Sequence, residues 1–351
     1  MVGRGRVNPS EDDLKLLAEV ARLYYIEDLN QEQIAQRVGG SRSNVSRMLR
    51  EARSRGLVEI RIRTPLATVP RLQEELKTRM GLRGCLVLAA DQEFRASEAA
   101  NTAVNNTAVD MAALTARYVQ ESIPDDTILG VGWSRTIYRS VNSGHFRKKR
   151  GVEVVQLMGS VGGNIPELDG VSTTGRLAGA LGATARYLHA PVLVADSTVR
   201  DGLLRDQNIR STLEIARRAD AMVVAVGPIN RDHGQYLTGY INDTHLDYIR
   251  GQGGVGDVCG SYFSRDGSLI PLEMNARTVA VGFEDMRRIP HRIGVSWGAD
   301  RPLGNIGAVR AGLLNVLITN EGAARSMVEI LDSEIAPTSS GTDATQTMYR
   351  Q

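Results

Sequence analysis

The sequence predicts an α/β protein that combines an N-terminal (winged) helix-turn-helix with a large doubly wound, mostly parallel α/β domain. Two observations predict it. Residues 30–55 carry two short helical patterns joined by a glycine turn, and further along the chain short β-branched runs alternate with alanine-rich helical stretches. Strands that are apolar on both faces and alternate with helices are typical of a parallel sheet covered on both sides.

The helix-turn-helix is predicted from local signals. Residues 11–28 place an apolar stripe at helical spacing, which indicates a supporting first helix. Asn30 and Gln33 form a capping-box pattern at the start of a second helix. Gly39-Gly40 ends that helix, because glycine readily adopts the positive φ of a tight turn. Ser41 is suited to cap the third helix.

The third helix has one apolar and one polar face. An apolar stripe from Val45 to Ala52 follows the spacing i, i+3, i+4, i+7 and is predicted to point inward. In a helix-turn-helix the N-terminal end of this helix enters the major groove, where hydroxyl, amide and guanidinium groups can reach base edges and phosphates. Duplex DNA is therefore the predicted partner. The predicted DNA-binding residues are Ser41, Arg42, Ser43, Asn44, Ser46, Arg47 and Arg50.

Basic charge is concentrated in the first part of the chain. Residues 1–64 hold 12 basic and 9 acidic side chains, whereas the rest holds 30 and 31. A local positive excess suits contact with phosphates, and it favours DNA binding over a plain three-helix bundle with a solvated basic face. Residues 57–63 alternate apolar and charged side chains, which predicts a short exposed strand, the wing.

Composition limits the classes of protein that this chain can be. No apolar run in the 351 residues approaches the ~20 residues of a membrane helix, and the N-terminus lacks a signal-peptide pattern. A cytoplasmic protein without a membrane segment is therefore expected. Cys85 and Cys259 have no metal-ligand spacing and the five histidines form no cluster, so reduced thiols and no metal or cofactor are expected.

The chain is expected to divide into five parts, because its composition shifts at Pro65, at Pro70 and near Pro337. These are a disordered start (1–10), a helix-turn-helix domain (11–64), a linker (65–70), the large domain (71–335) and a disordered tail (336–351). The tail is rich in serine, threonine and glycine, which bury too little apolar surface to order a segment.

The elements of the large domain are predicted from apolar runs and their spacing. A helix is expected at 71–80, because proline favours the first helical turn. The predicted strands are 85–89, 128–131, 152–157, 192–195, 222–226, 278–281 and 315–319. The predicted helices between them include 97–122, 173–188 and 209–219.

Glycine-containing loops follow three of the predicted strands. They are residues 128–136, 158–164 and 226–228, and the first also carries hydroxyls and Arg135 before a helix. Ligands of doubly wound sheets bind at the carboxyl ends of strands, where backbone N–H groups can hold an anion or a hydroxylated molecule. Each loop alone is compatible with a tight turn. Three on one sheet edge favour a ligand cleft.

Known nucleotide and catalytic signatures do not explain this cleft. The sequence contains no G-x-x-x-x-G-K-[ST] and no strand-linked G-x-G-x-x-G with an acidic residue about 20 positions on. It has no G-x-S-x-G, and no histidine can be assigned to a serine or cysteine nucleophile from the sequence.

Several of these segments together resemble the SorC family of sugar-binding transcriptional regulators. The resemblance covers about residues 11–332. It is carried by residues 41–49, 52–53, 56–58, 130–138, 156–163, 254–258 and 315–319. It implies an effector domain similar to the folds of glucosamine-6-phosphate deaminase and ribose-5-phosphate isomerase, used as a sensor. It also implies a sugar, polyol or sugar-phosphate effector and a homotetramer, a dimer of dimers, on operator DNA.

The resemblance also implies a set of effector-binding residues. Asp257 would accept hydrogen bonds from ligand hydroxyls, as an ionised carboxylate does. The implied residues are Gly132, Trp133, Ser134, Arg135, Thr136, Gly159, Ser160, Gly162, Asp257 and Arg301.

Three positions depart from the family pattern. Arg301 lies near a position where the family often has a lysine, and arginine can hold a phosphate but cannot form a Schiff base. Trp297 replaces a glycine, and Asn320 stands where an acidic residue is frequent. Trp133 and Trp297 could stack on a sugar or pack in the core. Both alternatives stay open, as does the phosphorylation state of the ligand.

The sequence therefore predicts a regulator of a carbohydrate-catabolism operon and not an enzyme. The alternative is a sugar-phosphate isomerase or deaminase with an appended DNA-binding domain. That enzyme would need a carboxylate base and a proton shuttle, and Asp257 is the one plausible candidate in the sequence. A helix-turn-helix adaptor that binds only protein would not explain the glycine loops.

Overall fold

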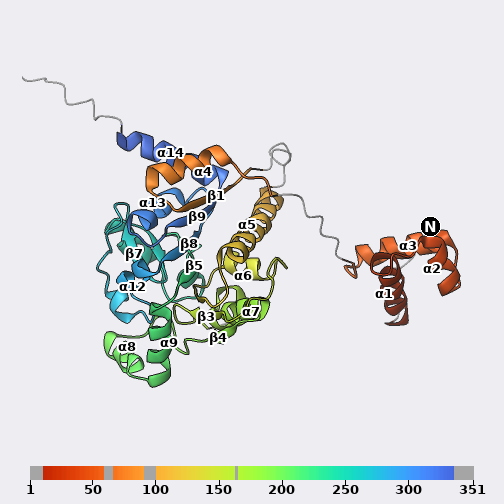
Figure 1. Ribbon diagram of the computed structural model, residues 1–351, viewed down its shortest axis with the longest axis horizontal. Helices are drawn as coiled ribbons and strands as arrows, with labels where there is room; N and C mark the ends of the chain where they lie inside the picture. Colours follow the sequence, from red (N-terminus) through yellow and green to blue (C-terminus); the bar gives the residue numbers. More distant parts are fainter. Residues whose placement is uncertain (1–10, 59–65, 91–99, 163–164, 336–351) are drawn as a thin grey trace, which may run out of the picture. The chain divides into compact units, whose positions relative to one another are not determined.

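The chain divides between Pro65 and Leu66 into two compact units (Figure 1). The computed structural model describes residues 11–58, 66–90, 100–162 and 165–335. The predicted wing lies, from residue 59 on, outside the described residues, and so do the two tails. No helix in the described part of the chain is long and apolar enough to cross a membrane.

The small unit is the predicted helix-turn-helix. It consists of α1 (Glu11–Tyr25), α2 (Gln31–Val38) and α3 (Arg42–Ser54) around one apolar core. The first helix ends three residues earlier than expected. Val45 and Ala52 of α3 are fully buried in this core, as the helical spacing predicted.

The helix boundaries of the small unit follow from their caps. Asn30 Oδ1 accepts a hydrogen bond from Gln33 N at 2.9 Å, and Gln33 Oε1 accepts one from Asn30 N at 2.9 Å. The predicted capping box is therefore confirmed. Gly39 ends α2 with a φ of +71°, and Ser41 Oγ accepts from Asn44 N at the start of α3.

The large unit is built on a seven-stranded parallel sheet in the order β1-β9-β8-β5-β2-β3-β4. The chain runs from β2 outward to β3 and β4, and then returns to β5 on the other side of β2. The strands are β1 (Gly84–Leu88), β2 (Ile128–Val131), β3 (Glu153–Gln156), β4 (Thr184–Arg186), β5 (Ala221–Ala225), β8 (His291–Val295) and β9 (Val316–Asn320). An antiparallel hairpin, β6 (Gly254–Val258) and β7 (Ser261–Ser264), lies outside this sheet.

Helices cover both faces of the sheet, so the doubly wound prediction is confirmed. One face packs against α5 (Ala100–Ser122), α6 (Arg135–Val141) and α7 (Gly170–Leu181). The other packs against α4 (Pro70–Met80), α9 (Gln207–Arg217), α11 (Asp243–Gly251), α12 (Phe283–Arg288), α13 (Pro302–Arg310) and α14 (Glu321–Ile335). Two short helices, α8 (Ser197–Leu204) and α10 (Gly234–Leu237), lie in connections.

Several predicted elements were wrong. Residues 192–195 and 278–281 are not strands of the sheet; they form isolated bridges, such as Leu193 with Thr278, beside it. The helix predicted at 173–188 is α7, which ends at Leu181 because Gly182 adopts a φ of +68°, and β4 follows. The strand β8 was missed, because it begins with His291-Arg292 and contains Gly294, which hide its apolar pattern.

The predicted linker at 65–70 belongs in large part to the sheet domain. Thr68 forms an antiparallel bridge with Leu88 of β1, and Val69 N donates to Val87 O at 2.9 Å. Pro70 is already the first residue of α4. Residues 66–70 therefore belong to the large unit, whereas Pro65 lies outside the described residues.

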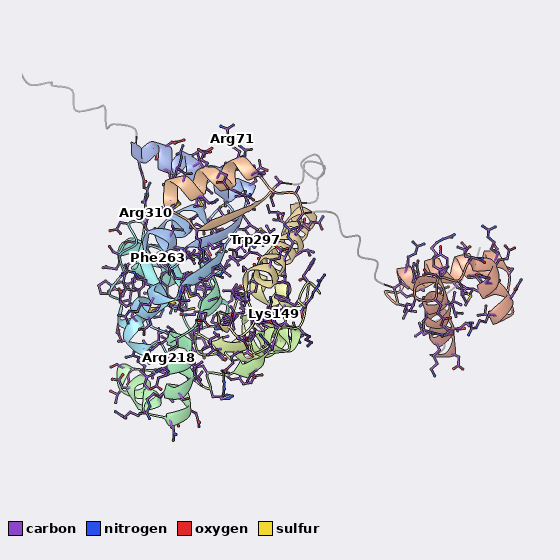
Figure 2. All side chains as sticks on the ribbon, in the orientation of Figure 1. Arg71, Lys149, Arg218, Phe263, Trp297 and Arg310 are labelled. Atoms are coloured by element: carbon purple, nitrogen blue, oxygen red, sulfur yellow. The ribbon has the colours of Figure 1, made fainter. Side chains whose placement is uncertain are left out.

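Helix α13 packs directly on the β6–β7 hairpin through glycines. A Cβ added at Gly307 would lie 2.8 Å from Ser264 O and 3.0 Å from Phe263 Cδ2, and one at Gly304 would lie 3.0 Å from Val255 O. Phe263 is fully buried inside the large unit (Figure 2). This close approach holds the hairpin against the start of α13.

Replacing Gly307 by alanine should destabilise the large unit. Overpacking against backbone costs about 1–3 kcal/mol, which exceeds the roughly 1 kcal/mol that alanine gains over glycine inside a helix. The matched control is Gly179→Ala in α7, where an added Cβ meets no atom within 4 Å. Urea unfolding should give a lower midpoint for Gly307→Ala and an equal or higher one for Gly179→Ala. Equal gains for both variants would contradict the packing argument.

Candidate functional site

A pocket of about 540 Å³ opens at the carboxyl ends of β2, β5 and β8. It lies where the strand order reverses, since β2 has β3 on one side and β5 on the other. In doubly wound sheets the loops that leave such strands diverge and leave a crevice for a ligand. The volume lies in the range of small-molecule sites. The ligand cleft predicted from the glycine loops therefore corresponds to a pocket in the structure.

The loop between β2 and α6 forms one wall. All five residues predicted there, Gly132 to Thr136, line the pocket. Ser134 is the N-cap of α6, and its Oγ accepts a hydrogen bond from Ile137 N at 3.1 Å. Arg135 is exposed at this wall. The cap thus sets the loop conformation, and among the described residues the Arg135 guanidinium forms no ion pair.

The second predicted loop does not line the pocket. Only Met158 of its described residues does so, whereas Gly159, Ser160 and Gly162 lie outside the lining. Ser160 Oγ hydrogen-bonds with Gln156 Nε2 at 3.2 Å, and its backbone bridges to Pro191. A Cβ at Gly159 would lie 2.5 Å from Pro191, so the glycine serves a close backbone contact. The glycine thus allows a close contact with another part of the chain, and not with a ligand.

Both tryptophans lie in the pocket wall and are half-buried. Trp133 Nε1 donates to Gly159 O at 3.0 Å, and Trp297 Nε1 donates to Thr136 Oγ1 at 3.0 Å. Each ring also packs against one of the two apolar cores. The rings therefore pack against the core, as one alternative expected, and also line the pocket; stacking on a sugar stays a prediction.

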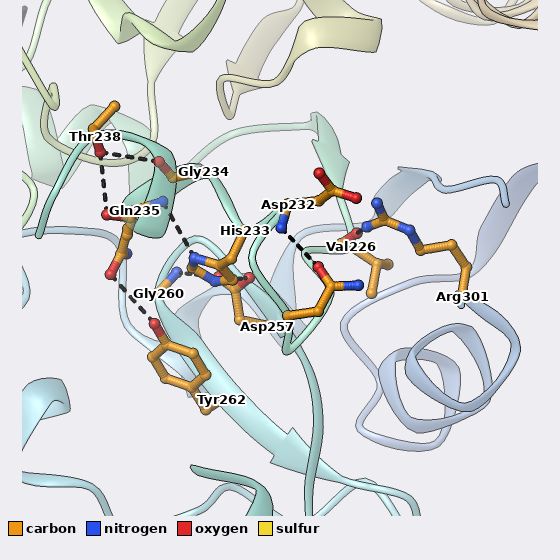
Figure 3. Close-up of polar contacts among 11 residues, drawn as sticks. Val226, Asp232, His233, Gly234, Gln235, Thr238, Asp257, Gly260, Tyr262 and Arg301 are labelled. Atoms are coloured by element: carbon orange, nitrogen blue, oxygen red, sulfur yellow. Dashed lines mark hydrogen bonds and ion pairs between the residues drawn. The ribbon is translucent and has the colours of Figure 1, made fainter. Parts of the chain in front are cut away.

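Asp257 enters the pocket from the β6–β7 hairpin. It is 7% exposed, and both carboxylate oxygens have protein partners. Oδ1 lies 2.9 Å from His233 Nε2, and Oδ2 accepts from Gly260 N at 2.9 Å (Figure 3). The hairpin turn is tight, because Cys259 and Gly260 both adopt positive φ, +51° and +79°. This turn fixes the direction in which the carboxylate faces.

His233 was missed by the sequence prediction. It is 2% exposed, lines the pocket and precedes α10, 24 residues before the carboxylate that it contacts. No local pattern links two residues at that separation. Only the pairing of the hairpin with the loop after β5, through the bridge between Gly227 and Asp257, brings them together.

Arg301 closes the pocket beside α13, with 19% of its side chain exposed. Its Nε lies 3.1 Å from Asp300 Oδ1, and its Nη1 donates to Val226 O at 3.2 Å. Its charge is therefore balanced by a neighbouring carboxylate. Asn320 also has a structural contact: its Oδ1 accepts from Gly298 N at 3.2 Å and holds the loop that carries Arg301.

Cys259 and Tyr262, two buried side chains close to Asp257, have raised pKa values. Burial, reinforced by the Asp257 carboxylate, raises the pKa of the Cys259 thiol far above its usual range. The same two causes raise the pKa of Tyr262. A thiol that stays protonated is a poor nucleophile, so Cys259 packs the floor rather than reacting. The described residues contain no group of three or more side chains that could hold a metal ion.

The polar face of α3 is open to a partner. Arg47 Nη2 donates to Asn44 Oδ1 at 2.8 Å, which orders two of the predicted DNA-binding residues on one side of the helix. Arg55, by contrast, is engaged with Glu51 at 2.6 Å. The predicted residues that are exposed are Ser41, Arg42, Ser43, Arg47 and Arg50, and those that are half-buried are Asn44 and Ser46.

Comparisons with known proteins match both units. The family described as "Putative sugar-binding domain" matches residues 65–329, and the one described as "Sigma-70, region 4" matches residues 18–55. The deoxyribonucleoside regulator of Bacillus subtilis is 29% identical over 317 residues, which cover 90% of this chain and 98% of that protein. The sorbitol operon regulator of Klebsiella pneumoniae is 26% identical over 323 residues, 91% of this chain and 99% of that protein.

A solved structure supports the same assignment of the fold. The full-length sorbitol operon regulator SorC from Klebsiella pneumoniae matches with a TM-score of 0.67 at 24% identity, over 91% of this chain and all of that one. A fold of this kind and a family match over most of the chain agree with the predicted resemblance. The chain belongs to the SorC family of transcriptional regulators, in which a helix-turn-helix is followed by a sugar-binding domain.

Proposed function

We propose that this chain binds operator DNA through α3 and that a sugar, polyol or sugar phosphate in the 540 Å³ pocket controls that binding. The observation that carries the proposal is the pairing, in one chain, of an exposed basic helix face with a pocket at the strand reversal. A binding unit and a pocket in separate parts of a chain are the two distinct sites that ligand control requires.

The names of the relatives indicate which ligands to test first. They include a deoxyribonucleoside regulator, a sorbitol operon regulator and an erythritol catabolism regulatory protein. We infer that the effector of this chain belongs to the same chemical class and that the chain controls an operon of carbohydrate catabolism in the cytoplasm. Sorbitol, erythritol and 2-deoxyribose, each with and without a phosphate ester, form a suitable panel.

We also infer that the active form is a homotetramer, a dimer of dimers. Helix-turn-helix proteins bind two half-sites about 34–36 Å apart, or multiples of that distance, with two recognition helices. A ligand that favours one arrangement of subunits over another changes the spacing of these helices and so the affinity for the operator. Subunit assembly supplies the second recognition helix that a single chain lacks.

The arrangement of polar groups supports a sensor rather than an enzyme. His233 accepts a hydrogen bond from Gln235 N at Nδ1, 3.2 Å away, and contacts Asp257 through Nε2. Both ring nitrogens are thus engaged by the protein, so this imidazole has no nitrogen left to shuttle a proton to a ligand. Asp257 alone would have to perform acid–base chemistry on a bound sugar.

Replacing Arg47 by alanine should lower operator affinity by about 5- to 150-fold, because a bidentate contact to a base is worth about 1–3 kcal/mol. The operator can be selected from a pool of random duplexes, and binding followed by fluorescence anisotropy. Arg53→Ala is the control on the same helix. Arg53 is exposed further along α3 and is expected to contact the DNA backbone, so its loss should weaken binding to all sequences alike and reduce the salt slope by about 1. Unchanged operator affinity of Arg47→Ala would remove Arg47 from the recognition face.

Replacing Asp257 by asparagine should abolish most of the stabilisation that a bound effector provides. A ligand at about 100 times its Kd stabilises the native state by about 2.7 kcal/mol, which appears as a higher Tm in a thermal-shift assay with the panel. The variant loses acceptor capacity for hydroxyls, so the shift should shrink. Asp243→Asn, at an exposed ion pair with Arg231 outside this pocket, should keep the full shift. A full shift for Asp257→Asn would exclude the carboxylate from ligand binding.

Effector binding should change the intrinsic tryptophan fluorescence of the whole chain. The sequence contains two tryptophans, and both line the pocket. A ligand that displaces water from their rings should shift the emission maximum and saturate at the Kd found by thermal shift. In Trp133→Phe the remaining signal reports on Trp297 alone. Saturable binding without any change in emission would place the ligand elsewhere.

A further inference from the structure

His233 and Asp257 line the pocket and form a buried pair with each other (Figure 3). The side chains are 3% and 10% exposed. Gly227 lies beside them, and a Cβ added there would lie 1.9 Å from Asp257 Oδ1. The glycine after β5 therefore leaves the space in which the carboxylate sits against the imidazole.

The hydrogen bonds determine where the proton of His233 lies. Gln235 N is a donor only, and it approaches Nδ1 at 3.2 Å, so Nδ1 must be the acceptor. The ring proton then lies on Nε2 and is donated to Asp257 Oδ1 at 2.9 Å. Gly260 N donates to the other carboxylate oxygen. Each oxygen of Asp257 thus has one protein donor and retains a lone pair for a second one.

The ring of His233 is held in place from two sides. It stacks on Tyr262, with ring centroids 5.8 Å apart and planes 18° apart, and Tyr262 OH donates to Gln235 Oε1 at 3.2 Å. The next residue, Gly234, contacts the pocket tryptophan so closely that an added Cβ would lie 2.6 Å from Trp133 Cζ3. The stack on Tyr262 and the close packing of Gly234 against Trp133 thus support the position of the imidazole.

We propose that His233 is a positioning residue that holds Asp257 as an acceptor, so that the pocket takes hydroxyl groups of the ligand at Asp257 and excludes its phosphate or carboxylate there. The inference rests on the proposed function, since it concerns the same pocket. A buried carboxylate whose two protein donors are in place accepts further hydrogen bonds from hydroxyls, whereas an anion at the same place would be repelled. A phosphate, where the ligand has one, would pair with the exposed guanidinium of Arg135, which lines the same pocket.

Two substitutions separate the two hydrogen bonds of His233. Glutamine places an amide N–H at the distance of Nε2 and can still donate to Asp257. Asparagine places an oxygen at the distance of Nδ1 and can still accept from Gln235 N, but it cannot reach Asp257. Both variants are first compared with the wild-type chain by urea unfolding, which measures the structural cost of each change.

The affinities of these variants for the panel of sorbitol, erythritol, 2-deoxyribose and their phosphate esters then test the proposal. His233→Gln should bind within a fewfold of wild type, whereas His233→Asn should bind about tenfold or more weakly, as for a lost hydrogen bond to a charged group. The opposite order would show that capping of α10 is what matters and would overturn the proposal. Analogues of the ligand that each lack one hydroxyl give a second test. If every one of them binds the wild-type chain as tightly as the parent ligand, the proposal is overturned as well.

A ligand-free measurement tests the proton position separately. In full-length protein labelled with ¹⁵N-histidine, long-range ¹H–¹⁵N spectra should show His233 protonated at Nε2 and not at Nδ1, with the signal assigned by its loss in His233→Gln. Protonation at Nδ1, or at both nitrogens, would overturn the positioning role. If no compound of the panel binds wild type, the proposed effector class fails, while this spectrum still decides the role of His233.

Discussion

The reversal of strand order between β2 and β5 is the constraint on which the rest of the large unit depends. Because the chain leaves β2 toward one edge and β5 toward the other, the loops after these strands diverge and no backbone fills the space between their carboxyl ends. The pocket residues on the loops after β2, β5 and β8 all follow from this arrangement. The order of the strands therefore determines where the pocket lies, and the side chains on the loops determine what lines it.

Two charged side chains of the pocket that are largely buried, Arg301 and Asp257, have partners within the protein. Arg301 lies against Asp300 and a backbone carbonyl, and Asp257 accepts from His233 and Gly260. A buried charge without a partner would destabilise the fold, and the contacts of Arg301 and Asp257 avoid this cost.

The two units reach their structures by different means. The small unit depends on short-range signals, such as the capping box of Asn30 and the positive φ of Gly39. The large unit depends on contacts between distant segments, such as α13 against the β6–β7 hairpin through Gly304 and Gly307. Each unit has a hydrophobic core of its own, so the two units are stabilised separately.

The sequence by itself determined the helix-turn-helix, the doubly wound sheet and the wall formed by residues 132–136, because caps, helical spacing and strand-end glycines are local signals. It failed where partners are distant. Gly159 and Ser160 turned out to pack against Pro191 and Gln156 rather than line the pocket, and β8 was hidden by its polar start. Only the tertiary structure decided that His233 meets Asp257, since a hydrogen bond across 24 residues depends on how a hairpin and a loop pack, which no periodicity along the chain records.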